Sequence, residues 1–252
     1  GPNKDRGGFA TMIRYPAGWV FAVPAGLAPE SVGPLMCAGI TTYSPLKRHA
    51  TRGDRVGIVG IGGLGHLALQ FGRAMGLEVY ALSRTADKEA EARGFGASGF
   101  VNTEDATQLA ALAGSFDVIL LTASGRAPLD PYLALLKPRG KLVCVSLPDK
   151  EERSQLYLHS AVRCAYTMRS TLLRACAILT LLTSACSAYQ VIFERALVGS
   201  YLGPHADYAE MLEMARDHGV RPQVELAPLS QINAMLERVR AGKARYRVVL
   251  QM

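Results

Sequence analysis

Short apolar runs alternate with stretches of helical periodicity between residues 55 and 146. Strands are predicted near 55–60, 78–83, 98–102, 117–122 and 140–146, with helices between several of them. After the first run, apolar residues recur at helical spacing until Gly76, namely Leu64, Leu67, Ala68, Phe71 and Ala74. Alternation of this kind predicts the α/β class with a doubly wound parallel sheet.

The N-terminal flank has a different pattern. Residues 7–28 contain two extended stretches, Gly8–Arg14 and Trp19–Val23, separated by prolines and glycines, which predicts β structure with turns. From Pro29 the apolar spacing predicts a helix that continues towards Leu46.

The C-terminal flank predicts one more helix and one more strand. Ser230 is expected to cap a helix that ends before Gly242, and residues 245–250 are expected to form the last strand.

Upstream, the chain from Leu156 to Phe193 is rich in Leu, Ala, Thr and Cys. The stretch 175–193 is diluted by polar residues, so we do not expect a membrane helix there.

The first strand runs directly into a glycine loop. Residues 55–65 read Arg-Val-Gly-Ile-Val-Gly-Ile-Gly-Gly-Leu-Gly, in which Gly60, Gly62 and Gly65 have the spacing G-x-G-x-x-G. The first glycine permits a tight turn, the second allows a pyrophosphate to approach the backbone, and the third allows close packing of helix on strand. Since strand, loop, helix and strand follow in order, we expect a Rossmann dinucleotide site at Gly60, Ile61, Gly62, Gly63, Leu64 and Gly65; a purely structural turn is the alternative.

The end of the second predicted strand indicates which dinucleotide binds. An NAD enzyme places an acid there for the ribose 2′-hydroxyl, whereas this chain has Ser83, followed by Arg84, Thr85 and Lys88. Hydroxyls and cations bind a 2′-phosphate, so NADP is the expected cofactor. An ordinary polar turn before a solvated helix is the alternative reading.

Composition narrows the function class. The chain has 252 residues, 49% of them hydrophobic, and a net charge of +7 from scattered basic residues, which does not suggest nucleic-acid binding. An anionic cofactor or substrate would account for that charge, and an ordinary solvated surface is the alternative. The 5 cysteines include no C-x-x-C pair, so a reducing, cytoplasmic setting is expected. Gly1 is not a start methionine and no leader opens the chain, which suggests a fragment or a processed product.

Several landmarks together resemble the zinc-type medium-chain alcohol dehydrogenases, particularly their cinnamyl-alcohol dehydrogenase branch. These are Gly7–Ala10, Pro34–Tyr43, the glycine loop, Val198–Ser200 and Arg245–Val249, together with the Ser-x-Thr-x-x-Lys run from Ser83. The resemblance covers nearly the whole chain except about residues 151–192. It implies a remnant of a GroES-like, β-rich catalytic domain over 1–36, an NADP-binding Rossmann domain over 37–200 with an atypical insertion at about 151–192, and a return to the catalytic domain over 201–252.

The resemblance also assigns residues. It makes Cys37 a catalytic zinc ligand and Thr41 a nicotinamide contact, and it makes Arg247 a contact of the pyrophosphate. Further cofactor-lining positions are Thr122, Ser146, Ser200, Tyr201 and Leu202. It implies a small aldehyde or alcohol substrate and a possible homodimer.

The family's other zinc ligands and its proton-relay residues lie upstream of the position that matches Gly7. Cys37 is therefore expected to be an orphaned ligand, since a catalytic zinc needs about three protein ligands. None of the 5 histidines stands in the family's His-Glu pattern, and each is interpreted as a surface or helix-end residue. Three hypotheses remain: an NADP- and zinc-dependent alcohol dehydrogenase that is incomplete as given, a non-catalytic NADPH-binding protein, or a zinc-free enzyme like the quinone reductases.

Overall fold

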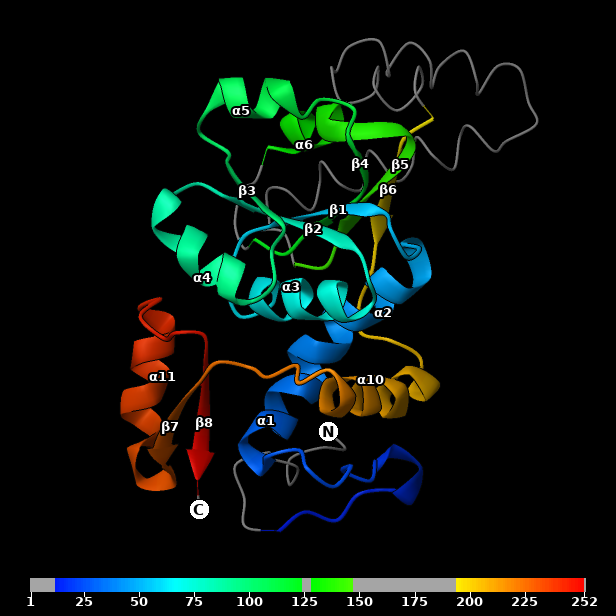
Figure 1. Cartoon of the computed structure of the whole chain (residues 1–252). Coiled ribbons are helices and arrows are strands. Elements are labelled where there is room, and N and C mark those ends of the chain that lie inside the picture. Colours follow the sequence, from blue (N-terminus) through cyan, green and yellow to red (C-terminus); the bar gives the residue numbers. More distant parts are fainter. Residues whose placement is uncertain (1–11, 124–127, 147–193, 252) are drawn as a thin grey trace, which may run out of the picture.

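A parallel six-stranded sheet forms the centre of the computed structural model, which describes residues 12–123, 128–146 and 194–251 (Figure 1). Its strand order is β3-β2-β1-β4-β5-β6. The strands are β1 (Arg55–Val59), β2 (Glu78–Ser83), β3 (Gly99–Asn102), β4 (Phe116–Leu121), β5 (Leu136–Cys144) and β6 (Ala196–Gly199). The predicted strands are thus confirmed, with β5 beginning earlier than expected. Expectations for residues 1–11 and 151–192 lie outside the described residues.

Helices cover both faces of this sheet, as the predicted doubly wound fold requires (Figure 1). Helices α3 (Gly65–Ala74) and α4 (Glu89–Gly94) lie on one face with α2 (Ile40–His49), and α5 (Ala106–Ala111) and α6 (Leu129–Leu135) lie on the other. A short 3₁₀ turn, η3 (Ala86–Lys88), precedes α4.

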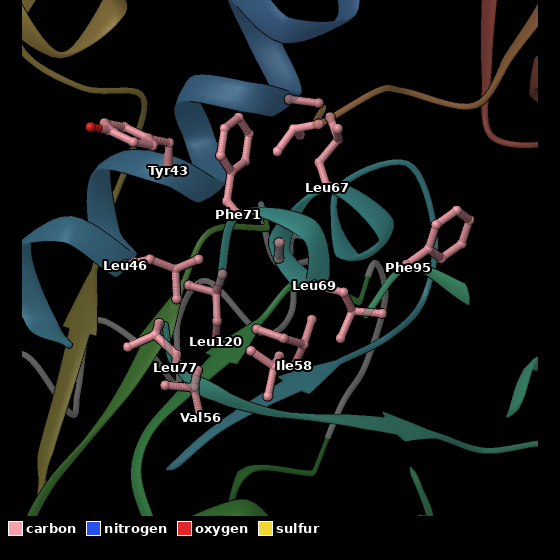
Figure 2. Close-up of a cluster of buried hydrophobic side chains, with 14 of the residues drawn as sticks. Tyr43, Leu46, Val56, Ile58, Leu67, Leu69, Phe71, Leu77, Phe95 and Leu120 are labelled. Atoms are coloured by element: carbon pink, nitrogen blue, oxygen red, sulfur yellow. The ribbon is translucent and has the colours of Figure 1, made fainter. Parts of the chain in front are cut away.

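Two apolar clusters fill the spaces between the sheet and its helices. Because successive strand residues point to opposite faces, Leu120 packs with α2 and α3 while its neighbour Ile119 packs towards α6. Figure 2 shows the first cluster, where residues of β1 and β4 meet α2 and α3. There the rings of Tyr43 and Phe71 lie edge to face at 5.5 Å, which joins α2 to α3.

The β structure predicted for residues 7–28 is wrong where it can be compared. Residues 12–28 contain one 3₁₀ turn, η1 (Ala17–Trp19), and no strand. Pro16 and Pro24 lack backbone donors, and no described strand pairs with this segment, so a ladder does not form.

The predicted helix from Pro29 is confirmed, but it is not uniform. It comprises α1 (Pro29–Pro34), a π-helical turn η2 (Leu35–Gly39) and then α2. Cys37 lies in the π turn, and the expected domain boundary at residues 36 and 37 falls inside this continuous helical stretch.

The C-terminal region adds a second, two-stranded parallel sheet. Helix α10 (His205–Asp217) leads to β7 (Val224–Pro228), the 3₁₀ turn η4 (Leu229–Gln231), α11 (Ile232–Arg240) and β8 (Arg247–Gln251), and β7 pairs with β8. The predicted helix and strand are confirmed. Ser230 lies inside η4 and makes no side-chain cap, because the 3₁₀ turn moves the start of α11 beyond it.

Helix α10 is joined to α2 by charged hydrogen bonds. The buried carboxylate of Asp207 accepts from Ser44 Oγ and from Lys47 Nζ, each at 2.8 Å. Tyr43 donates to Glu210 at 2.6 Å, and Lys47 also pairs with Glu210.

Over the described ranges, none of the helices combines the length and apolar content that crossing a membrane requires.

Candidate functional site

The glycine loop lies where the strand order reverses. Strands β1 and β4 are neighbours, and the chain leaves them towards helices on opposite faces, which opens a crevice at their carboxyl ends. Gly60 follows β1 directly, and its N–H donates to the carbonyl of Leu82 at 2.9 Å. Its φ is +88°, and a Cβ there would stand 2.9 Å from the backbone of Ala123. Only glycine is suited to this turn.

Thr122 holds the loop from the end of β4. Its Oγ1 lies 2.6 Å from the carbonyl oxygen of Gly60 and 2.9 Å from that of Val59, so its proton is directed at the loop backbone. Behind it, a Cβ at Gly65 would overlap the Gly60 carbonyl oxygen and lie 3.1 Å from Thr122 Oγ1. The third glycine therefore allows α3 to start directly against β1.

The outer side of the loop combines open space with a cation. A Cβ at Gly62 would have no heavy atom within 4 Å, so that side of the backbone is accessible. Next to it, Arg247 Nε donates to the carbonyl of Gly63 at 3.2 Å. Burial lowers the pKa of this guanidinium, but a guanidinium remains protonated at neutral pH. Open backbone at the start of a helix beside a cation is suited to a pyrophosphate.

The residues expected to determine whether NADP or NAD binds lie at the end of β2, which neighbours β1. Ser83 is its buried last residue, and Arg84 and Thr85 are exposed beyond it. Lys88 reaches back to the loop, where its Nζ donates to the carbonyl of Ile61 at 3.0 Å. Thr85 donates to Asp87, so that hydroxyl already has a partner.

The other expected cofactor positions lie along the same sheet edge or close to it. Thr122, Ser146 and Ser200 follow β4, β5 and β6, whose carboxyl ends share one edge. The Oγ of Ser200 is buried with no hydrogen-bond partner among the described atoms, which leaves it available to a ligand. Tyr201 is exposed and Leu202 packs against the core. Thr41 is buried in α2, and its hydroxyl donates to the carbonyl of Cys37 at 2.7 Å.

Cys37 does not form a metal site with the other described residues. It is exposed in a cavity of about 300 Å³ that is otherwise lined by Gly33, Pro34, Ala38, Arg247, Val248 and Val249. Across residues 12–123, 128–146 and 194–251, no three His, Cys, Asp or Glu side chains gather closely enough to hold a metal ion. A catalytic zinc needs about three such ligands. The described residues therefore do not fit zinc, whereas the glycine loop, Arg247 and Ser200 fit a dinucleotide.

The sequence interpretation overlooked His66. It is the second residue of α3, in agreement with the expectation of a surface or helix-end histidine, but it is fully buried, and no role in the site was predicted for it. Its two ring nitrogens contact Gly62 and Gln223. Its position directly after the third glycine was the available signal.

Comparison with known proteins agrees with this geometry. A family model described as "Zinc-binding dehydrogenase" matches residues 63–217. The chain is 36% identical over 251 residues to a probable formaldehyde dehydrogenase of Bacillus subtilis, covering 99% of this chain and 63% of that protein. It is 35% identical over 249 residues to an NADP-dependent alcohol dehydrogenase of Mycolicibacterium smegmatis, covering 98% of this chain and 62% of that protein.

Solved structures show the same relationship. A cinnamyl alcohol dehydrogenase from Sorghum bicolor is 32% identical with a TM-score of 0.72, covering 90% of this chain and 57% of that one. A cinnamyl alcohol dehydrogenase from Helicobacter pylori, complexed with NADP(H), is 28% identical with a TM-score of 0.69, covering 93% and 58%. The chain thus spans only about 60% of the length of its relatives. By sequence and fold, it belongs to the zinc-binding dehydrogenase family, and cinnamyl alcohol dehydrogenases are among the relatives that it resembles.

Proposed function

We propose that this chain binds NADP(H) across the glycine loop and forms the cofactor-binding part of an oxidoreductase that interconverts alcohols and aldehydes. The observation that carries the proposal is the loop itself, which has open backbone at Gly62 and the guanidinium of Arg247 on Gly63. The nucleotide pyrophosphate lies against Gly62 and Gly63, where backbone N–H groups, the start of α3 and Arg247 neutralise its charge.

The adenosine ribose lies beyond the end of β2. Ser83 takes the place of the acid that would repel a 2′-phosphate, and Arg84 and Lys88 supply positive charge. At the other end, Thr122, Ser146 and Ser200 face the nicotinamide riboside along the carboxyl edge of the sheet. Thr41 contacts the nicotinamide, with Tyr201 and Leu202 beside it. NADP(H) supplies the hydride, and the residues named here bind and orient it.

The substrate class comes from the relatives, which are named for cinnamyl alcohol, formaldehyde and alcohols in general. We assign this chain a small aldehyde or alcohol substrate, a homodimeric state and a cytoplasmic setting. Residues 1–36 and 201–252 belong in this scheme to the catalytic domain, and residues 37–200 to the cofactor domain. The resemblance to the zinc-type dehydrogenases implies a zinc ion that polarises the substrate oxygen, but the described residues of this chain do not supply a set of ligands for it.

A second candidate is a non-catalytic NADPH-binding protein. It is favoured by the surroundings of Cys37, which belongs to no group of three metal-ligating side chains among the described residues. Both candidates require the same cofactor site, and they differ only in turnover.

Fluorescence titration of the purified chain with NADPH and with NADH tests the shared part. Saturable binding of NADPH, at least about tenfold tighter than NADH, is expected because one pairing of 2′-phosphate with a cation contributes roughly 1.5–3 kcal/mol. Equal or tighter binding of NADH contradicts the cofactor assignment. Steady-state reduction of an aromatic aldehyde, with and without added zinc, then separates the two candidates, since binding without turnover supports the second.

A further inference from the structure

His66 closes a circuit of hydrogen bonds around the glycine loop. Its Nδ1 lies 2.9 Å from the carbonyl oxygen of Gly62, and its Nε2 lies 3.1 Å from the backbone N of Gln223. Gln223 precedes β7, and its carbonyl accepts from the N–H of Arg247 at 3.2 Å. The side chain of Arg247 then returns to Gly63. These hydrogen bonds thus connect Gly62 to Gly63 through Gln223 and Arg247, which belong to the second sheet or lie next to it.

These contacts determine where the imidazole proton lies. The N–H of Gln223 can only donate, so Nε2 must be the unprotonated acceptor, and the proton must lie on Nδ1. Nδ1–H then donates to Gly62, whose carbonyl also accepts the backbone N–H of His66 at 3.1 Å. The cationic ring could not accept from Gln223, and the other neutral tautomer would break both contacts.

The surroundings favour the same neutral state. The ring is stacked on Tyr246 at 4.8 Å between ring centroids, with Phe95 edge-on at 5.6 Å. Burial lowers the pKa of His66 to about 4; the Gly62 carbonyl and the charge of Glu91 act in the opposite direction, and the charge of Arg247 acts in the same one. Glu91 is itself hydrogen-bonded by Tyr246 and Arg245.

We propose that His66, as the neutral Nδ1–H tautomer, is a positioning residue that sets the Gly62 backbone and the guanidinium of Arg247 in register for a dinucleotide pyrophosphate. This rests on the proposed function, because the ligand is the cofactor assigned there. His66 itself touches no substrate. It acts through Gly62 on one side and through Gln223 and Arg247 on the other.

The binding test uses His66→Phe, which keeps a flat ring between Tyr246 and Phe95 but makes neither hydrogen bond. We expect the Kd of NADPH to rise at least about tenfold, because the Gly62 carbonyl loses one of its two donors and the Gln223 N–H loses its partner. NADH should weaken by a similar factor, since the pyrophosphate is common to both. His218→Phe, at the exposed end of α10, is the matched control and should bind as the unaltered chain does. An unchanged Kd in His66→Phe, or a loss confined to NADPH, overturns the proposal.

Two further variants test the proposal if His66→Phe does not fold. An Asn amide at position 66 can reach Gly62 only, and a Gln amide can reach Gln223 only, so each is expected to show a smaller loss than Phe. A double-mutant cycle with Arg247→Met tests the coupling. If His66 acts through Arg247, the combined loss is smaller than the product of the two single losses, whereas a simple product contradicts the proposal.

A cofactor-free measurement separates this inference from the proposed function. In ¹⁵N-histidine-labelled protein, the His66 signal, identified by its absence from His66→Phe, should show a protonated Nδ1 and a bare Nε2 at pH 6 and pH 8. A protonated Nε2 at either pH overturns the inference, whatever the chain binds. Failure of the unaltered chain to bind any dinucleotide overturns the proposed function instead.

Discussion

Two glycines of the same loop, Gly62 and Gly65, should respond differently to alanine. At Gly65 the new Cβ overlaps the carbonyl oxygen of Gly60 and lies 3.0 Å from its carbonyl carbon, so no rotamer change can relieve the contact. At Gly62 the new Cβ meets no protein atom within 4 Å, and its φ is not among the positive values. One substitution therefore disturbs packing, and the other occupies only the space assigned to the ligand.

The magnitudes follow from these contacts. Overpacking costs about 1–3 kcal/mol or more, and the higher helix propensity of alanine offsets up to about 1 kcal/mol of it. Gly65→Ala should therefore lower the free energy of unfolding by roughly 1–3 kcal/mol, or several degrees in Tm at about 2–4 °C per kcal/mol. Gly62→Ala should leave stability unchanged or raise it by about 0.4–1 kcal/mol through the unfolded state. Its methyl group should nevertheless weaken NADPH binding by at least about tenfold, equivalent to about 1.4 kcal/mol.

Urea unfolding followed by NADPH titration of both variants measures these effects. A Gly62→Ala protein that binds NADPH as the unaltered chain does would refute the position assigned to the pyrophosphate. A Gly62→Ala protein less stable than Gly65→Ala would refute the packing argument. Gly62→Ala is the reference for the stability of Gly65→Ala, and the unaltered chain is the reference for the binding of both variants.

The remaining predictions concern the 2′-phosphate and the contact of α10 with α2. Lys88→Met should raise the Kd of NADPH about tenfold and leave that of NADH unchanged, with exposed Lys243→Met as control; equal losses for both nucleotides would contradict the role given to Lys88. Asp207→Asn should lower the free energy of unfolding at pH 7 by about 1–3 kcal/mol, because Lys47 loses its buried partner. Burial raises the pKa of Asp207, but hydrogen bonds from Lys47 and Ser44 outweigh it and hold that pKa below its ordinary value. Its stabilisation is therefore complete above about pH 4 and is lost as pH falls through the lowered pKa, so the deficit of the variant should shrink in acid; a deficit independent of pH would refute this.

Apolar patterning was sufficient to predict strands β1 to β5 of the central sheet, whereas β6 was not predicted. Strands β1 and β2 are buried on both faces and end at glycine or polar residues, so their limits are local properties of the sequence. The prediction of β structure for residues 12–28 was wrong because strand formation there depends on residues outside the segment. Its extended residues resemble a strand locally, but a strand also needs a partner, and pairing over long range is not visible in a single stretch of sequence.

The site residues also fall into those that the local sequence could predict and those that depend on distant parts of the chain. The glycine spacing and the residues after each strand could be read along the chain, because a parallel sheet brings those ends to one edge. The resemblance alone implied that Arg247 contacts the pyrophosphate, and its contact with Gly63 was not predicted, since 184 residues separate the two. His66 was missed because its role depends on Gln223 and Tyr246, which reach it only through the fold of the second sheet.

A crystal structure of this chain grown with NADPH tests the central claim most directly. The account predicts the pyrophosphate against the backbone of Gly62 and Gly63 beside Arg247, with the 2′-phosphate within hydrogen-bond reach of Ser83, Arg84 or Lys88. Density for NADPH elsewhere, or a pyrophosphate that does not contact the loop, would contradict it.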